Sequence, residues 1–114
     1  MLKKILKRLA SKATYQVGEL YTIPLNGEYG IFKVLKVEER GVHVCLYSNL
    51  YEKTPSKIDI SELYIDENKI SGSNHTPLHY SSLKLWRPSY LQDAEVEKEE
   101  LYSYHNWREN PYFI

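Results

Sequence analysis

Cysteine, net charge and long hydrophobic runs are what this sequence lacks. Its one cysteine, Cys45, excludes an internal disulfide and favours a reducing compartment. Lysine plus arginine number 15 and aspartate plus glutamate also number 15, so no net charge favours nucleic acid or a membrane. No hydrophobic run approaches a membrane span, and cations interrupt the first residues, which is untypical of a secretory signal. These absences predict a cytoplasmic protein.

Phenylalanine is also scarce, with 2 residues against 11 tyrosines. Tyrosine combines an apolar ring with a polar tip, which suits both half-exposed sheet faces and contact surfaces. Two interpretations follow: a small β-rich domain that uses tyrosine on its strands, which is the more frequent case, or a dedicated aromatic interface.

The length of 114 residues fits one domain, residues 1–114, and the charges are unevenly spread along it. Residues 1–14 carry five cations and no acid, whereas residues 91–114 carry six acids and two cations. The first segment has Leu2, Ile5, Leu6 and Leu9 at helical spacing and predicts a basic amphipathic helix. That helix could pack on the sheet, lie on an anionic membrane or dock on an acidic partner; packing on the sheet is favoured.

Residues 15–47 predict a three-stranded antiparallel meander. Two apolar and aromatic runs meet at Asn26 and Gly27, a pair that suits a tight type I′ turn because both tolerate positive φ. A polar turn at residues 38–41 precedes a third, alternating run. One face of that strand would carry Val42, Val44 and Leu46, and the other His43, Cys45 and Tyr47.

The remaining segments have weaker signals. We expect a loop at residues 48–57, a short strand with a turn at 58–65, a flexible loop at 66–77 and a last strand at 79–86. Residues 93–107 predict a helix, and residues 112–114 an apolar tail packed on the body. The fold class is therefore mainly β (α+β). It is either a twisted antiparallel meander or a small SH3-like, partly open barrel, with a helix at 1–14, the β-meander at 15–86 and a helical, acidic tail at 87–114.

The sequence predicts no catalytic residue, no metal and no cofactor. His75 and His79 have the spacing of helical zinc ligands, but Pro77 lies between them. His43 and Cys45 could join them only if the sheet register also delivers His75. Nothing near Cys45 would activate it as a nucleophile, and the acids of residues 93–100 are too close together for an opposed catalytic pair.

A nucleic-acid interface needs cations interleaved with aromatic rings on one surface. Such a patch would form if neighbouring strands bring together Lys33, Lys36, Lys84, Trp86 and Arg87. The neutral charge balance makes nucleic acid an unfavoured partner, because affinity for phosphates comes mostly from counterion release.

Residues 15–35 resemble the opening of the immunity protein 26 family. The shared pattern is glycine, acid, aromatic and Ile-Pro-Leu, then a turn with glycine, an aromatic-glycine step and a strand ending in Val-Leu. The matching residues are Gly18, Glu19, Tyr21, Ile23, Pro24, Leu25, Gly27, Tyr29, Gly30, Val34 and Leu35. Trp86 and the acidic segment after it also look like the family's tail.

This resemblance implies an antitoxin role: members are thought to bind a cognate bacterial toxin domain in polymorphic-toxin and contact-dependent inhibition systems. It implies a mainly β fold and supplies no catalytic residues. The predicted contact surface is the acidic, tyrosine-bearing segment, with three further aromatic residues. It comprises Tyr90, Asp93, Glu95, Glu97, Glu99, Glu100, Tyr102 and Tyr104, together with Tyr47, Tyr51 and Trp86. The loops at residues 49–57 and 68–77 are a second candidate.

Two other classes of function stay open. Small β-barrel endoribonuclease toxins also begin with glycine, acid, aromatic and proline at similar spacing, although their catalytic partners cannot be identified here. A nucleic-acid or peptide-binding module on an SH3-like barrel is the other class.

Overall fold

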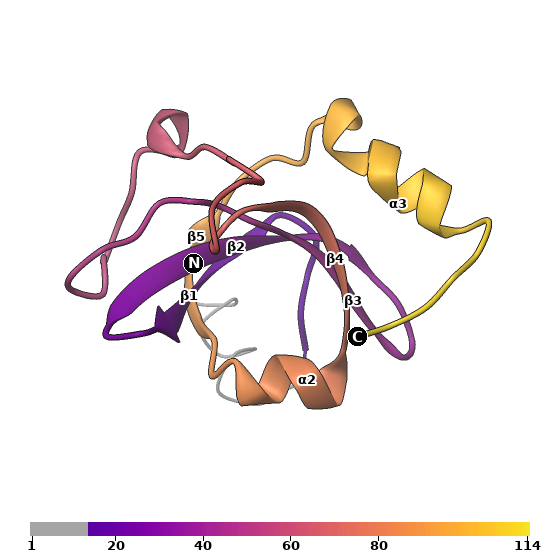
Figure 1. Ribbon diagram of the computed structural model, residues 1–114, viewed down its shortest axis with the longest axis horizontal. Helices are drawn as coiled ribbons and strands as arrows, with labels where there is room; N and C mark the ends of the chain where they lie inside the picture. Colours follow the sequence, from indigo (N-terminus) through magenta and orange to yellow (C-terminus); the bar gives the residue numbers. More distant parts are fainter. Residues whose placement is uncertain (1–13) are drawn as a thin grey trace.

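The computed structural model describes residues 14–114, so the helix expected at residues 1–14 lies almost wholly outside the described residues. The described chain forms one five-stranded antiparallel sheet in the order β4-β3-β2-β1-β5. Figure 1 shows that the sheet is strongly curved, with helix α2 (Tyr80–Leu85) across its concave side. The sheet is open rather than closed, which confirms the predicted mainly β, α+β class.

The meander predicted for residues 15–47 is confirmed. Its strands are β1 (Glu19–Leu25), β2 (Glu28–Val37) and β3 (Gly41–Leu46). Asn26 and Gly27 join the first two with φ values of 48° and 84°, the two positive angles that a type I′ turn requires. The tight turn fixes the register, and Leu25 pairs directly with Glu28.

Alternation along the three strands gives the sheet a core on each face. Val42 and Val44 join Tyr21, Phe32 and Leu83 on the concave face, beneath α2. Cys45 and Tyr47 point to the convex face, as predicted, into a second cluster whose buried members are Leu20, Ile31, Leu35, Cys45, Tyr47 and Ile58. The segments around residues 58–65 and 94–101 cover that second core.

Three predictions for the middle of the chain are wrong. Residues 58–65 contain no strand but the 3₁₀ helix η1 (Ile60–Glu62), because the side chain of Asp59 accepts a hydrogen bond from the Ser61 amide and closes a turn. The second half of the loop expected at 66–77 is strand β4 (Ser73–His79), which pairs along β3. The strand expected at 79–86 is α2, capped by the His79 side chain.

After α2, the chain forms strand β5 (Ser89–Asp93), which the sequence did not indicate. Asp93 therefore belongs to a strand, and the helix predicted for residues 93–107 begins later. It consists of the 3₁₀ helix η2 (Lys98–Leu101) followed by α3 (Tyr102–Trp107). The predicted packing of the tail is confirmed, because Ile114 exchanges backbone hydrogen bonds of 2.9 Å with Pro77 and His79 of β4. Among residues 14–114, no helix combines the length and the apolar character needed to cross a membrane.

Candidate functional site

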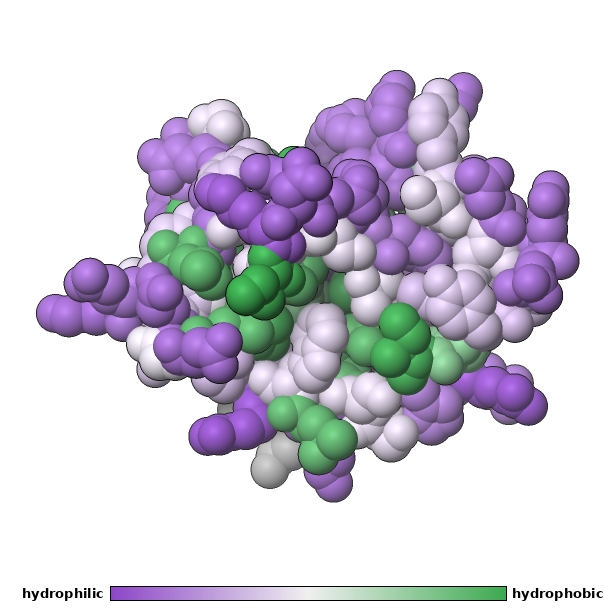
Figure 2. All heavy atoms as spheres, in the orientation of Figure 1, coloured by the Kyte–Doolittle hydropathy of each residue, from purple (hydrophilic) through white to green (hydrophobic). Residues whose placement is uncertain are grey.

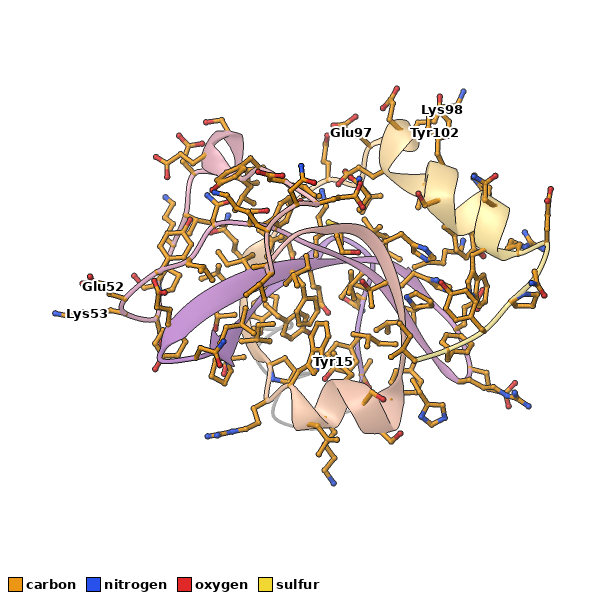
Figure 3. The ribbon with its side chains drawn as sticks, in the orientation of Figure 1. Tyr15, Glu52, Lys53, Glu97, Lys98 and Tyr102 are labelled. Carbon is orange, nitrogen blue, oxygen red and sulfur yellow. The ribbon has the colours of Figure 1, made fainter. Side chains whose placement is uncertain are left out.

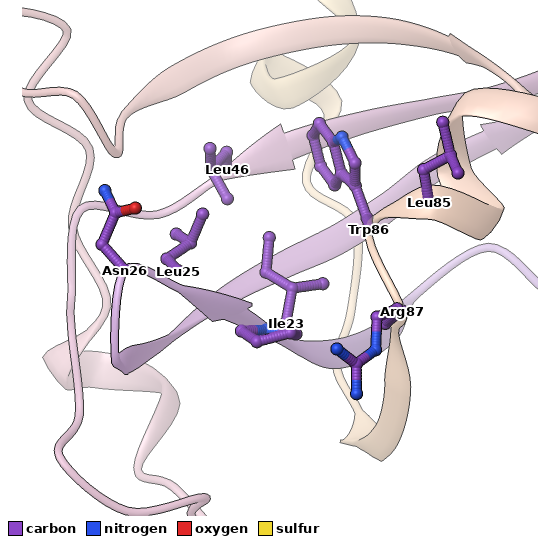
Figure 4. A pocket seen from close by; sticks show the side chains of 8 residues that line it. Ile23, Leu25, Asn26, Leu46, Leu85, Trp86 and Arg87 are labelled. Atoms are coloured by element: carbon purple, nitrogen blue, oxygen red, sulfur yellow. The ribbon is translucent and has the colours of Figure 1, made fainter.

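Exposed carboxylates and one tyrosine gather between the end of β5 and the start of α3. Glu95, Glu97 and Glu99 are exposed, and Tyr102 has 60% of its surface exposed. Figure 3 shows Glu97, Lys98 and Tyr102 together at one end of the molecule, all directed away from the sheet. We call Glu95, Glu97, Glu99 and Tyr102 the acidic ridge.

Local hydrogen bonds hold the backbone of the ridge. The amide of Glu97 donates to Oε1 of Glu100 at 2.8 Å, and the Glu97 side chain accepts from the Glu100 backbone, which together form a capping box. The box starts η2 directly after an extended stretch and leaves the Glu95 and Glu99 side chains in solvent. A capping pattern of this kind starts a helix but does not by itself indicate its length.

Lys33 ties the ridge to the sheet. Its side chain is only 4% exposed, and its Nζ donates to the Glu95 carbonyl at 2.9 Å and to Glu100 Oε1 at 2.8 Å. Glu100, with 24% of its side chain exposed, therefore supports the ridge through this ion pair. Lys33 also cannot belong to the predicted cationic patch, because its charge is buried and paired with Glu100.

The other predicted contact residues lie elsewhere. Tyr47 and Tyr104 are 7% and 4% exposed, so a partner cannot reach their rings in this conformation. Tyr51 is half-buried and pairs with Tyr29 in an isolated bridge. Tyr90 lies on β5, where its hydroxyl donates to Asp93 Oδ1 at 2.8 Å and its ring packs edge-on against Tyr21.

Of the two loops of the second prediction, the one at residues 49–57 lies away from the ridge. Figure 3 shows Glu52 and Lys53 at the tip of a loop on the opposite side of the molecule. Of residues 68–77, the last part forms β4 and is held in the sheet. Asn74 of this strand lines a pocket of about 230 Å³ together with Glu99 and Tyr102 of the ridge.

Trp86 lines an apolar groove of about 460 Å³ at one end of the concave face. Its indole ring packs edge-on against Phe32, and the neighbouring Leu85 has 81% of its surface exposed. Arg87 follows with a positive φ of 55°. The lining residues are Ile23, Pro24, Leu25, Asn26, Leu46, Leu85, Trp86 and Arg87. In Figure 2, hydrophobic side chains show over the middle of this view and over α2, while hydrophilic ones dominate the outline.

On the convex face the sheet register does deliver His75 to His43. Nδ1 of His43 lies 2.8 Å from Nε2 of His75, and the two rings are within 10° of parallel. On the other side of the ring, Nε2 of His43 lies 3.2 Å from Glu38 Oε2. Oε1 of Glu38 accepts a hydrogen bond from the Tyr104 hydroxyl at 3.1 Å. We call His43 and His75 the imidazole pair.

The surroundings keep the pair uncharged near neutral pH. Burial lowers the pKa of His43, against the opposing effect of Glu38, and the side chain is 0% exposed. Burial, and then the nearby His43, lower the pKa of His75 to about 4. Two imidazoles that already bond each other and a carboxylate are a stable polar network rather than an open metal site.

The described residues do not assemble the other chemistry considered. His79 caps α2 and is absent from the pair, and burial raises the pKa of the Cys45 thiol, which disfavours the reactive thiolate. Among residues 14–114, no group of three or more histidine, cysteine, aspartate and glutamate side chains could hold a metal ion.

Comparison of the chain with family models, with curated proteins and with solved structures finds no match in any of the three. The resemblance to the immunity protein 26 family therefore stays a prediction from residues 15–35.

Proposed function

We propose that this chain is an immunity protein that binds a cognate bacterial toxin domain in the cytoplasm and neutralises it by occlusion, without turnover of a substrate. The sequence pattern at residues 15–35 supports the class of function. The observation that supports the binding mode is the acidic ridge, because it presents Glu95, Glu97 and Glu99 beside an exposed tyrosine.

The ridge has the properties of a surface for a basic partner. Its carboxylates lie in solvent, where they accelerate encounter with a positively charged cleft, and Tyr102 offers a large ring that a partner can bury. Lys33 and the capping box fix the ridge backbone before binding, so little ordering is needed on association. The proposed partner is therefore a toxin domain with a basic active-site cleft, as in enzymes that act on nucleic acid.

The test reverses the exposed carboxylates of the ridge and leaves the ion pair with Lys33 intact. Glu97→Lys keeps the bond from the Glu97 amide to Glu100 and removes only the side-chain half of the capping box. The substitutions Glu95→Lys, Glu97→Lys and Glu99→Lys spare Glu100, whose reversal would place a second ammonium against buried Lys33. The matched control reverses three exposed acids far from the ridge in sequence, with Glu39→Lys, Glu52→Lys and Glu62→Lys. Both triple variants change the net charge equally, so only position differs between them.

The partner is sought first as a toxin domain in the product of the neighbouring upstream gene, and its binding is measured by calorimetry and by growth protection. We expect the ridge variant to bind at least about tenfold more weakly and to associate more slowly, while the control changes affinity by less than about threefold. Full protection by the ridge variant would exclude the ridge as the binding surface. Cleavage of RNA by the purified chain would instead support the rival endoribonuclease class and overturn the proposal.

A further inference from the structure

The imidazole pair lies beneath the face that α3 buries against the rest of the described chain. The two buried residues of α3 are Tyr104 and Trp107, and the ring centroids of both lie within 5 Å of His43, at 4.7 and 4.2 Å. Phe113 of the following segment adds a third ring at 5.7 Å. The contact between the sheet and the C-terminal segment therefore centres on a histidine ring that no water reaches.

Hydrogen bonding assigns the protons of the neutral pair. The Glu38 carboxylate can only accept, so Nε2 of His43 carries a proton and donates to it. Nδ1 of neutral His43 is then an acceptor, and Nε2 of His75 donates to it. The chain of hydrogen bonds from Tyr104 through Glu38 and His43 to His75 is thus continuous, with one proton on each ring.

One additional proton can be accommodated, but two cannot. A single imidazolium keeps one donor and one acceptor between the rings, and Glu38 offers it a negative charge. With both rings protonated, Nδ1 of His43 and Nε2 of His75 each carry hydrogen and face each other across 2.8 Å. The hydrogen bond is lost, and two like charges stand side by side, one of them on the fully buried ring of His43.

Among residues 14–114, Glu38 is the one carboxylate that bonds to the pair. Glu38 and Lys36 lie at the end of β2, and Lys36 places its Nζ 5.6 Å from the Tyr104 ring centroid. Tyr104 is the titratable group on α3 that touches the network, and Trp107 and Phe113 contribute uncharged rings. Glu38 can balance one proton, and Lys36 adds to the repulsion of the second.

We propose that the imidazole pair is a proton-sensitive clamp: when neutral, it holds α3 and residues 111–114 on the sheet, and double protonation releases them while the sheet stays folded. This proposal does not rest on the proposed function, because it concerns the free chain. Release of α3 would also displace Tyr102, the first residue of that helix, so acid would alter the acidic ridge.

Amide hydrogen exchange followed by NMR between pH 7 and pH 4, corrected for intrinsic rates, tests the clamp. The reporters are the Arg108 amide, which donates to Tyr104 within the α3 segment, and the Ile114 amide, which donates to Pro77. The Tyr47 amide, which donates to Ile31, reports on the sheet. We expect Arg108 and Ile114 to lose protection as the pH falls, more steeply than one proton would give, while Tyr47 stays protected.

Two variants separate the pair from general acid sensitivity. His75→Gln keeps an amide donor for His43 but cannot be protonated, so the loss of protection should move about one pH unit lower. His105→Gln is the matched control, because His105 is exposed on the same helix and should leave the midpoint unchanged. Imidazole ¹⁵N shifts of the wild-type chain give the protonation of His43 and His75 without any substitution.

Three results would overturn the clamp. The first is the same midpoint in the wild-type chain and in His75→Gln. The second is two fully protonated imidazoles with the Arg108 amide still protected. The third is loss of Tyr47 protection together with that of Arg108, which would mean global unfolding instead of local release.

Discussion

At the scale of the residue, Lys33 and Glu100 form one ion pair but differ in how much water reaches them. The Lys33 side chain is 4% exposed and that of Glu100 is 24% exposed. Removing the partner of a buried charge costs more than removing the partner of a charge that can hydrate. The two sides of the pair should therefore respond differently to neutral substitution.

We predict that Glu100→Gln destabilises the chain more than Lys33→Met does. The first leaves a buried ammonium with neutral acceptors and should cost about 3 kcal/mol, whereas the second leaves a partly hydrated carboxylate and should cost about 1–2 kcal/mol. Urea denaturation at pH 7 measures both values. A larger loss of unfolding free energy in Lys33→Met than in Glu100→Gln would contradict this explanation.

At the scale of the element, α2 shows why a pattern of alternate leucines misleads. Leu83 and Leu85 are two apart and indicate one face of a strand, but in the helix Leu83 is 0% exposed and Leu85 is 81% exposed. The hydrogen bond from the Ser81 amide to the His79 ring, 3.1 Å long, starts the helix. Histidine is an unusual N-cap, so the sequence carried little signal for it.

The two leucines give a matched pair of substitutions. Leu83→Ala should cost about 2–4 kcal/mol of unfolding free energy because it leaves a cavity under α2. Leu85→Ala should change stability by less than about 0.5 kcal/mol, because its side chain is in solvent. Thermal melts of both variants distinguish the helix from a strand, in which the two leucines would share a face and behave alike.

The central strands could be predicted from sequence and the outer ones could not. The turn at Asn26 and Gly27 and the alternation from Val42 to Tyr47 are local signals, and the structure follows them. Strand β4 buries only Pro77 and Leu78, and it is a strand because β3 offers hydrogen bonds along its free edge. Partners that lie far away in sequence leave no such local pattern.

The candidate site was predictable to a similar extent. Acid content alone located Glu95, Glu97 and Glu99, which are exposed. It could not separate Glu100, which pairs with Lys33, nor show that Tyr104 packs inward on His43. From the sequence, His43 and His75 suggest only a possible metal site, which depends on the sheet register bringing them together. The clamp that we propose for it depends on the carboxylate of Glu38, which sequence spacing does not connect to the pair.

At the scale of the whole molecule, the imidazole pair makes stability depend on pH. The pKa of His75 is about 4 in the folded chain, below the ordinary value of 6.5. Between these values the unfolded chain binds more protons, so stability is complete above about pH 6.5 and falls as the pH drops toward 4. The contribution should be about 1–2 kcal/mol, less than the full shift implies because water still reaches the ring.

Urea midpoints at pH 7 and pH 4.5 measure this dependence. The difference between the two midpoints should be smaller in His75→Gln than in the wild-type chain, since carboxylate effects are common to both. An equal difference in the two proteins would remove His75 as a source of the pH dependence.

The backbone bonds between Ile114 and β4 have a consequence for how copies of this chain behave toward one another. A sheet that stays open has two outermost strands whose unpaired amides can recruit a neighbour and start a polymer. The backbone of Ile114 hydrogen-bonds to the outward amide of His79 and the outward carbonyl of Pro77. These two groups of the edge strand β4 are therefore not available to another chain. As long as residues 112–114 stay bound to β4, they hinder the pairing of this edge with the sheet of a second copy.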